Sequence, residues 1–230
     1  MGSLPPSRFF PPVEVANDDG LLGFGGELTP EWLLDAYRHG IFPWPIDEET
    51  PVPWWSPDPR AIIELDQFHV SRRLRRTLHS GPFKVTCDRD FEGVIRGCAT
   101  ADDRVGQTWI TPAMIEAFTR MSELGHAHSV EAWYEGRLAG GTYGMAIGGV
   151  FAAESKFYQV RDASKVALAC LVSHLKARGY VLFDIQQLTP HTARLGASEI
   201  PRKTYLARLA EALTLPVTFG DKLEPALDRL

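Results

Sequence analysis

The chain has 230 residues, of which 44% are hydrophobic and 23% charged, a composition typical of a soluble globular protein with one large or two modest domains. Its formal net charge of −5 argues against bulk binding of nucleic acid, although a local basic patch can override that average. The longest apolar run, VALACLV at 166–172, is too short to cross a bilayer, so we expect no membrane partner.

The cysteines and the histidines argue against a metal centre and for a cytoplasmic location. Cys87, Cys98 and Cys170 are an odd number in no metal-ligand spacing, so we expect reduced thiols. No pair of histidines has metal-ligand spacing on one helix, so we expect no metal site. The first residues, MGSLPPSRFFPP, contain no apolar core of a signal peptide.

Residues 1–58 are rich in Pro, Gly and Trp and predict a small, irregular N-terminal domain. One helix is indicated there, because Thr29 fits the N-cap, Pro30 the first helical position and Gly40 the residue that closes it. The rest of this part predicts loops and turns held in place by aromatic side chains.

Residues 59–230 have a more regular pattern and predict a second domain. Strands are expected at 61–65, 83–87, 129–134, 138–147, 150–155 and 182–186, and helices at 71–78, 91–98, 111–124, 164–178, 191–195 and 202–213. The turns Glu135-Gly136 and Gly148-Gly149 favour two successive hairpins among the three middle strands.

The order of hairpin, hairpin, long helix and strand is similar to the core of the N-acetyltransferase-like (GNAT) superfamily, which implies an α+β class with a mixed sheet. GNAT enzymes hold the pyrophosphate of acetyl-CoA on a turn with two glycines before the long helix. The corresponding turn here, Gln159-Val-Arg-Asp-Ala-Ser164, has neither glycine. Backbone amides need glycine to approach a phosphate closely, so CoA is disfavoured as a donor.

The stretch LFDIQ at 182–186 places a carboxylate in an apolar strand. Because side chains alternate along a strand, Asp184 and Gln186 are expected to point to the same face. Burying a carboxylate without a partner costs several kcal/mol or more, so the position of this pair needs an explanation. The pair either makes a structural hydrogen bond or takes part in catalysis.

The stretch HVSRRLRR is strongly basic at what the pattern predicts to be the start of a helix capped by Ser71. Cations at a helix N-terminus oppose the macrodipole, whereas the free N–H groups there favour anions. The stretch therefore indicates either a site for the phosphates of a short duplex or a solvated, salt-bridged face. The residues concerned are Arg72, Arg73, Arg75 and Arg76.

Tryptophans are concentrated in loop-rich segments. Trp44, Trp54 and Trp55 lie among prolines, and Trp109 lies in the motif GQTWIT. Such rings either plug a core or stack on unpaired 3′-terminal bases, an interaction that contributes about 1–3 kcal/mol per base.

The chain resembles one family closely, the leucyl/phenylalanyl-tRNA–protein transferases, in motifs that run over nearly its whole length. These are GLLGFGGELTPEWLLDAYRHGIFPWP, WWSPDPRA, HVSRRLRR, TWIT, GHAHSVE, GGTYGMA, ESKF, DASK, FDIQ and LGASEIPR. The resemblance implies an enzyme that moves Leu or Phe (Met less readily) from Leu-tRNA or Phe-tRNA to proteins with N-terminal Arg or Lys. We expect this enzyme to be a monomer. The new N-terminus marks those proteins for degradation. No cofactor, metal or ATP is expected, because the tRNA ester is already activated.

The resemblance also implies roles for particular residues. It makes Asp184 and Gln186 the catalytic pair and Glu154 a further acid of the site, and it places Trp44 and Trp109 near the terminal adenosine. The basic cluster of four arginines is implied to grip the acceptor stem. We expect the strands and the helix around this site to form an apolar pocket for the donor side chain. The candidate residues are Tyr143, Phe151, Phe157, Leu168, Leu171 and Ile185. For each of them the alternative is simple packing in the core.

Three departures from the family pattern leave the ranking of donors open. Lys156 stands in ESKF where the family has Met, Ile185 stands where Cys is common, and Thr142 stands where a larger apolar residue is frequent. Competing functions are a catalytically inactive tRNA-binding protein and an aminoacyl-tRNA-dependent transferase with a different acceptor. A CoA-dependent acetyltransferase is disfavoured by the missing glycines.

Overall fold

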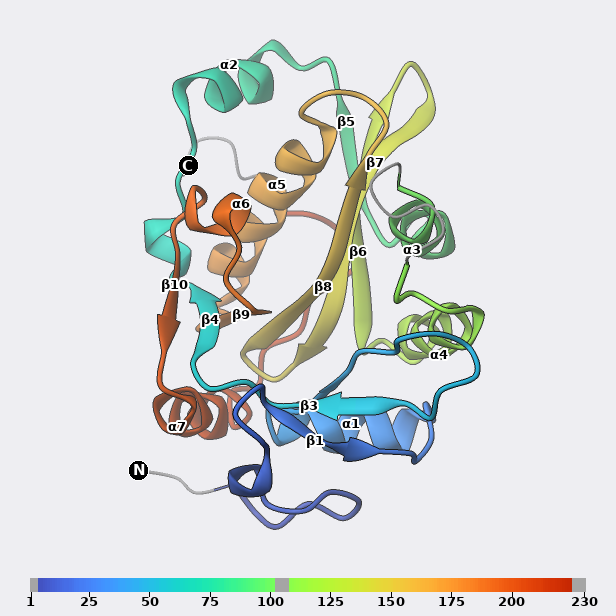
Figure 1. Ribbon diagram of the computed structural model, residues 1–230. Helices are drawn as coiled ribbons and strands as arrows, with labels where there is room; N and C mark the ends of the chain where they lie inside the picture. Colours follow the sequence, from blue (N-terminus) through green and yellow to red (C-terminus); the bar gives the residue numbers. More distant parts are fainter. Residues whose placement is uncertain (1–3, 102–107, 225–230) are drawn as a thin grey trace.

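The computed structural model describes residues 4–101 and 108–224, and its centre is a seven-stranded mixed sheet (Figure 1). Neighbouring strands are antiparallel except β8 and β9, which are parallel and are connected through the helix α5 (Ala163–Arg178). A parallel pair needs such a crossover, so the long helix lies where the hairpin-helix-strand order predicts it. In spatial order the strands are β10 (Ala197–Ile200), β4 (Arg60–Ile63), β9 (Leu182–Gln186), β8 (Val150–Tyr158), β7 (Arg137–Ile147), β6 (Ala127–Tyr134) and β5 (Lys84–Cys87).

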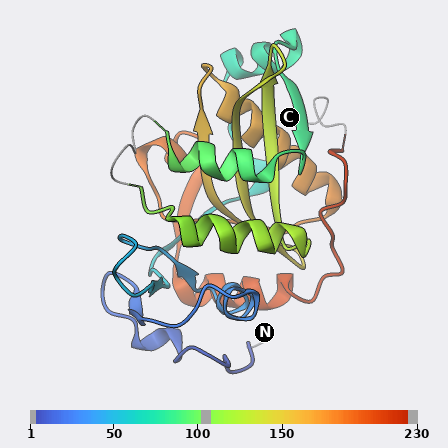
Figure 2. The same ribbon diagram turned by 90° about the vertical axis from the view of Figure 1, so that its right-hand side faces the viewer.

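Helices cover both faces of this sheet (Figure 2). The helix α5 packs on one face, and α3 (Phe91–Ala99) and α4 (Pro112–Glu123) pack on the other. Two adjacent glycines of β7 allow this close approach. A Cβ at Gly140 would lie 2.8 Å from the Cβ of Ala163 in α5, and one at Gly141 would lie 2.9 Å from Val94 in α3.

The N-terminal part contains a second, three-stranded antiparallel sheet, which the sequence pattern does not predict. Its order is β1 (Leu21–Phe24), β3 (Pro53–Trp55) and β2 (Phe42–Pro43), beside a single-turn 3-10 helix at Val13–Val15. Strands of two to four residues rich in Pro, Gly and Trp carry no alternating pattern, which is why the segment looks irregular. The predicted helix is confirmed as α1 (Pro30–Arg38), with Thr29 at its N-cap.

The N-terminal part and the main sheet share one hydrophobic core. Leu33, Tyr37 and Trp54 belong to the same cluster of buried side chains as Phe118 and Tyr143, which come from the α/β part. The predicted boundary between residues 58 and 59 stays a prediction, and the packing is continuous across it.

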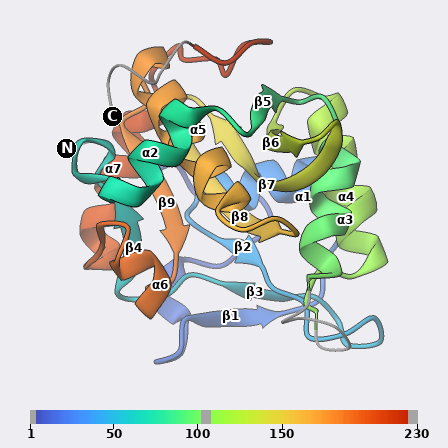
Figure 3. The ribbon, with the colours of Figure 1, turned by 90° about the horizontal axis from the view of Figure 1, so that it is seen from above.

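The remaining elements lie around one end of α5 and along the sheet edge. These are a 3-10 turn at Leu65–Gln67, α2 (Arg72–Ser80), α6 (Pro190–Ala193) and α7 (Arg202–Ala212). Seen from above, α2 lies over α5, while β1 and β3 lie to one side (Figure 3). The edge strand β10 was not predicted, because its polar residues Ser198 and Glu199 are exposed and interrupt any apolar run. Among the described residues, no helix is both long and apolar enough to cross a membrane.

Strands β8 and β9 pair over only three residues and then separate. Val150, Phe151 and Ala152 pair with Leu182, Phe183 and Asp184, whereas β8 continues to Tyr158 alongside β7. Strand β9 ends at Gln186, whose φ of 66° lies in the left-handed region that is uncommon for residues other than glycine. The separation leaves the second half of β8 open on the side where β9 would have continued.

Candidate active site

Asp184 is fully buried and forms an ion pair with Arg60 of the neighbouring strand β4. The Nε of Arg60 donates to Asp184 Oδ1 at 2.9 Å, and Nη2 donates to Oδ2 at 2.6 Å. The remaining Nη1 donates to the carbonyl of Gly40 at 3.0 Å, so the guanidinium also contacts the N-terminal part. This two-bond geometry is the strong form of an arginine–carboxylate pair.

Two aromatic rings enclose the guanidinium of Arg60. Its central carbon lies 4.8 Å from the ring centre of Phe42 and 4.6 Å from that of Tyr205, distances suited to cation–π contact. Burial alone would lower the pKa of Arg60, but the Asp184 carboxylate beside it raises that pKa above its ordinary value. Tyr205 also donates its hydroxyl to Asp184 Oδ2 at 2.8 Å.

Asp184 holds the backbone of Gln186 and not its side chain. The N–H of Gln186 donates to Asp184 Oδ1 at 2.9 Å. The Gln186 side-chain amide therefore has another partner. The expectation that both side chains share a face assumed an extended strand, whereas Gln186 has a left-handed backbone conformation.

Glu154 is the residue that contacts the Gln186 amide. The Nε2 of Gln186 donates to Glu154 Oε1 at 2.9 Å, and the hydroxyl of Tyr37 donates to the same oxygen at 2.5 Å. The other oxygen, Oε2, is buried and has no hydrogen-bond partner. Burial raises the pKa of Glu154 to about 8; the hydrogen bond from Tyr37 lowers it and the charge of Asp184 raises it further.

Trp44 and Trp109 lie side by side although they come from distant parts of the chain. Their ring centres are 5.7 Å apart, with the planes inclined at 51°. Both rings are half-buried, and both pack against the core shared by the N-terminal part and the main sheet. By contrast, Trp54 is buried and donates from Nε1 to the carbonyl of Gly25 at 2.7 Å, as a core residue does.

Most of the side chains expected to form an apolar donor pocket lie in the core. Phe151 is 1% exposed and packs against the rings of Tyr180, Phe183 and Phe219. Leu168, Leu171 and Tyr143 are also buried, and Ile185 packs at the margin of the same core. Only Phe157 of this set lines the cavity described below. The burial of Phe151 and Leu171 agrees with the alternative of simple core packing, and their role toward the donor stays a prediction.

The four arginines of HVSRRLRR are exposed on α2, and Ser71 caps that helix as predicted, accepting from the Leu74 N–H at 3.2 Å. Arg73 forms an ion pair with Asp162, the residue before α5, at 2.8 Å. Within the described parts of the chain, Arg72, Arg75 and Arg76 make no ion pair.

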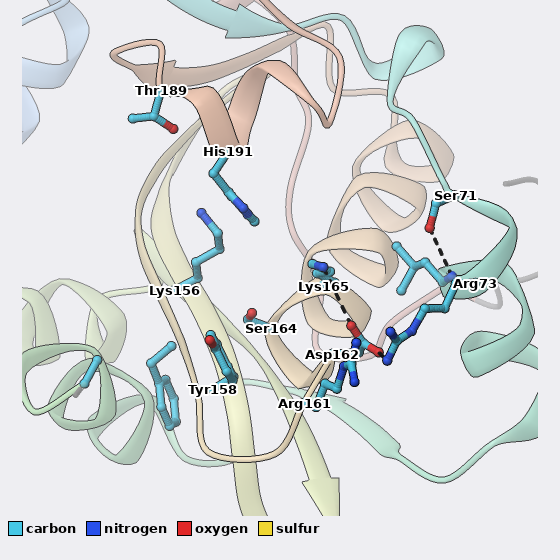
Figure 4. A pocket seen from close by; sticks show the side chains of 13 residues that line it. Ser71, Arg73, Lys156, Tyr158, Arg161, Asp162, Ser164, Lys165, Thr189 and His191 are labelled. Carbon is cyan, nitrogen blue, oxygen red and sulfur yellow. Dashed lines mark hydrogen bonds and ion pairs between the residues drawn. The ribbon is translucent and has the colours of Figure 1, made fainter. Parts of the chain in front are cut away.

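A cavity of about 780 Å³ lies between α2, the start of α5, the open half of β8 and the segment that follows β9 (Figure 4). Its most prominent side chains are Arg73, Lys156, Arg161, Lys165 and His191. Lys156 follows Glu154 by two residues on β8, and His191 follows Gln186 by five. The strand β8 therefore connects the cavity to Glu154, and the segment from the end of β9 to α6 connects it to Gln186.

The described residues contain no group of three or more His, Cys, Asp or Glu side chains able to hold a metal ion. No disulfide joins Cys87, Cys98 or Cys170 in the part of the chain that the structure describes.

Comparison with known proteins identifies the family. Residues 62–210 match the family model described as leucyl/phenylalanyl-tRNA protein transferase, and residues 26–58 match the model of its N-terminal domain. The chain belongs to this family. The resemblance inferred from the motifs is thereby confirmed.

Relatives of the same name cover nearly the full chain. The leucyl/phenylalanyl-tRNA–protein transferase of Nitratidesulfovibrio vulgaris (strain DP4) is 52% identical over 213 residues, or 92% of this chain and 90% of that protein. That of Anaeromyxobacter dehalogenans (strain 2CP-C) is 50% identical over 219 residues, or 94% and 93%. The solved structure of L-PGS from Bacillus licheniformis is 14% identical and covers 68% of this chain and 50% of the L-PGS chain. Its TM-score of 0.40 is too low to carry an argument.

Sequence reasoning missed Arg60, Tyr37 and Tyr205, all of which contact the Asp184, Gln186 and Glu154 side chains or backbone. Arg60 lies in the motif WWSPDPRA, where an arginine followed by the apolar run Ala-Ile-Ile signals a buried charge that needs a partner. The two tyrosines carry no comparable signal, because a tyrosine on an amphipathic helix is usually part of the core.

Proposed function

We propose that this protein transfers Leu or Phe, and Met less readily, from aminoacyl-tRNA to the N-terminal Arg or Lys of acceptor proteins. The observation that carries the proposal is the 50–52% identity to leucyl/phenylalanyl-tRNA–protein transferases over more than nine-tenths of the chain. The ester of aminoacyl-tRNA is already activated, so the reaction needs no metal, CoA or ATP. Action in the cytoplasm and as a monomer remain parts of this proposal.

The reaction is the attack of an α-amine on an ester carbonyl. An α-amino group has a pKa of about 7.7–8, so roughly one in ten is already neutral near pH 7 and no strong base is needed. Orientation of that scarce nucleophile is the larger requirement, and positioning is what a protein site supplies best. The released proton leaves through water or the departing ribose oxygen.

We assign the orientation of the amine to Gln186. Its Nε2 is engaged by Glu154, which turns the side-chain carbonyl oxygen away from that contact and leaves it to accept a hydrogen of the amine. Gln does not titrate in this range, so it aims the lone pair and does not act as a Brønsted base. Tyr37 donates to the same oxygen of Glu154 and thereby helps to fix the direction of the Gln186 amide.

We assign Glu154 a second role toward the acceptor. Its buried Oε2 has no partner, and an incoming Arg or Lys residue carries positive charge at both its α-amine and its side chain. A nearby cation favours the ionised form of a carboxyl group, so binding of the acceptor lowers the raised pKa of Glu154 and gains an ion pair.

Asp184 acts as a positioning residue in this proposal, because Arg60 and Tyr205 occupy its oxygens and its exposure is 0%. It holds the N–H of Gln186 in the left-handed conformation that directs the Gln186 side chain to Glu154. Substitution of Asp184 therefore lowers transfer through Gln186.

The direct test is incubation with labelled Leu-tRNA and a protein that bears N-terminal Arg, with an N-terminal Ala protein as control. Label is expected on the Arg protein alone. Asp184→Ala and Gln186→Ala are each expected to reduce transfer severalfold or more without weakening tRNA binding. Full-speed transfer by either variant refutes its assignment, and tRNA binding without any transfer favours the alternative of an inactive tRNA-binding protein.

The preference between Leu and Phe is tested by the same assay with both donors. Lys156 lines the cationic cavity, so it does not extend an apolar surface as the family's Met does at this position. A Lys156→Met variant that changes the Leu:Phe ratio would assign this residue to donor choice.

A further inference from the structure

The last described residues form a strap along one side of the molecule (Figure 2). Residues 215–224 follow α7, contain no helix or strand and pack against α5. Among the described residues, no backbone–backbone hydrogen bond joins residues 218–224 to another element. Side chains of α5 make hydrogen bonds to this backbone instead, so the position of the strap depends on a few side chains.

His174 of α5 uses both nitrogens of its ring to hold the strap. Its Nε2 donates to the carbonyl of Phe219 at 2.8 Å, and its Nδ1 accepts the N–H of Glu224 at 3.0 Å. A carbonyl oxygen only accepts and a backbone N–H only donates, so these two bonds require the neutral ring with its proton on Nε2. His174 is 0% exposed, so water replaces neither partner.

A second proton on the His174 ring is incompatible with this arrangement. The protonated ring carries an N–H on both nitrogens, and its Nδ1–H would face the N–H of Glu224 with no acceptor between them. Burial lowers the pKa of His174 below its ordinary value of 6.5; the Phe219 carbonyl raises it in part, and the charge of Arg178 lowers it. Between the lowered value and 6.5, the released strap therefore gains a proton that the bound strap excludes.

Arg178 of α5 supplies hydrogen bonds to the strap that a proton on the buried histidine does not break. Its Nε donates to the carbonyl of Thr218 at 2.9 Å, and its Nη2 donates to the Thr218 hydroxyl at 2.8 Å. Its Nη1 lies 3.5 Å from the Glu224 carboxylate. The two other charged side chains of the strap, Asp221 and Lys222, are exposed. An arginine stays charged throughout, so these bonds do not make the strap sensitive to pH.

His128 of β6 is the second histidine beside the strap, and a proton affects its contacts differently. Its ring stacks on the ring of Phe219, with ring centres 4.2 Å apart and planes inclined at 12°. Its Nδ1 lies 2.7 Å from a carboxylate oxygen of Asp88, which accepts that N–H from the neutral and from the protonated ring alike. A proton on His128 therefore breaks no hydrogen bond to the strap, which leaves His174 as the pH-dependent contact.

The strap supports the strands that carry the proposed catalytic residues. The Phe219 ring is 2% exposed and packs on Phe151 of β8, with ring centres 5.9 Å apart. Phe151 pairs with Phe183 where β8 and β9 meet. Phe151 precedes Glu154 by three residues, and Phe183 directly precedes Asp184. Withdrawal of Phe219 leaves a space beneath this pairing, and a space of that kind destabilises the side chains around it.

We propose that His174 is a pH-sensitive latch: it binds the strap while its ring is neutral and releases it in mild acid, which loosens β8 and β9 and lowers transfer. A cleft of about 850 Å³ borders residues 217–221, the start of β6 and the end of β7, so the strap has space to leave α5. Release of the strap does not depend on the proposed function, whereas the fall in transfer rests on it.

Hydrogen exchange followed by mass spectrometry tests the latch directly, with protection factors corrected for the intrinsic pH dependence of exchange. The protection of residues 217–224 should fall about tenfold for each pH unit below 6.5, while that of residues 167–172 in α5 should not fall with it. His174→Gln keeps a side-chain N–H for the Phe219 carbonyl but does not titrate, so its strap should show no such fall. The matched control His128→Asn keeps an N–H for Asp88 and should behave as the wild type.

The transfer assay with Leu-tRNA tests the consequence for activity. Wild type and His174→Gln are compared at about pH 7.5 and about pH 5.5, because their ratio cancels the titration of the acceptor amine and of Glu154, which both proteins share. We expect the ratio of wild type to variant to fall by up to about tenfold, the linkage for one pH unit below the ordinary value of histidine. Circular dichroism verifies that the variants are folded.

Equal pH slopes of strap protection in wild type and His174→Gln overturn the latch. A ring-nitrogen NMR titration of the wild type overturns it as well if His174 gains a proton while the strap stays protected, and this measurement needs no variant. A constant activity ratio while the strap is released overturns the link to catalysis. Absence of transfer by the wild type at both pH values counts against the proposed function instead, and the exchange result then decides the latch by itself.

Discussion

The buried ion pair between Arg60 and Asp184 gives the sharpest test of the site. Arg60→Met removes three hydrogen bonds, two to Asp184 and one to the Gly40 carbonyl, and leaves the carboxylate at 0% exposure without its counter-charge. Removal of one partner of a buried pair costs about 3–5 kcal/mol. That is a large share of a typical free energy of unfolding of about 5–15 kcal/mol.

The reciprocal substitution separates stability from positioning. In Arg60→Met/Asp184→Leu no charge remains buried, so we expect most of the stability to return, with a coupling energy of about 2 kcal/mol or more. Transfer activity should not return, because the N–H of Gln186 then lacks the acceptor that holds its left-handed conformation.

Urea unfolding followed by circular dichroism measures the stability, and the transfer assay with Leu-tRNA measures the activity. The matched control is Arg208→Met, which breaks the partly exposed pair with Glu64 (2.6 Å) and should cost about 1 kcal/mol or less. The reasoning fails if Arg60→Met unfolds within about 1 kcal/mol of the wild type, or if the double variant transfers at the wild-type rate.

Three further predictions concern the neighbouring side chains. The pKa of Glu154 is raised from 4.5 to about 8, so between these pH values the native state retains a proton that the unfolded state releases. As the pH rises through this range, the stability of the wild type should therefore fall by up to a few kcal/mol more than that of Glu154→Gln. Parallel pH profiles of urea unfolding for the two proteins would contradict this. Gln186→Gly should raise stability by up to about 1 kcal/mol by relieving the positive φ, yet abolish most transfer; a decrease in stability would argue against strain. Trp109→Ala should raise KM for aminoacyl-adenosine by about tenfold, as expected for removal of a stacking ring, and an unchanged KM would make the ring a core residue.

Much of the α/β part was predictable because its signals are local. The hairpin turns at Glu135-Gly136 and Gly148-Gly149, the caps at Ser71 and Thr111 and the long apolar helix each depend on residues close in sequence. The short strands β1, β2, β3 and β10 were not predicted, because two to four residues hold too little periodicity and their pairing is decided by distant partners.

The candidate catalytic residues could be named from the sequence, but neither their contacts nor the residues that hold them could. Asp184, Gln186 and Glu154 are named by the motifs, yet only the separation of β8 from β9 and the left-handed backbone of Gln186 decide which of them touch. Arg60 is 124 residues from Asp184, and it becomes the partner because β4 and β9 are neighbouring strands. No local pattern contains that adjacency.

These contacts also bring the N-terminal part to the candidate site. Tyr37 of α1 donates to Glu154, and the carbonyl of Gly40, just after that helix, accepts from Arg60. One N-terminal segment therefore contacts both Glu154 and Arg60. Glu154 accepts from the Gln186 side chain, whereas Arg60 pairs with Asp184, which accepts from the Gln186 backbone N–H. Because these contacts lie at the edge of the shared core, the direction of the Gln186 amide depends on how the N-terminal part packs against the sheet. In this arrangement the N-terminal part supports the Gln186 side chain through Tyr37 and Glu154, and the Gln186 backbone through Arg60 and Asp184.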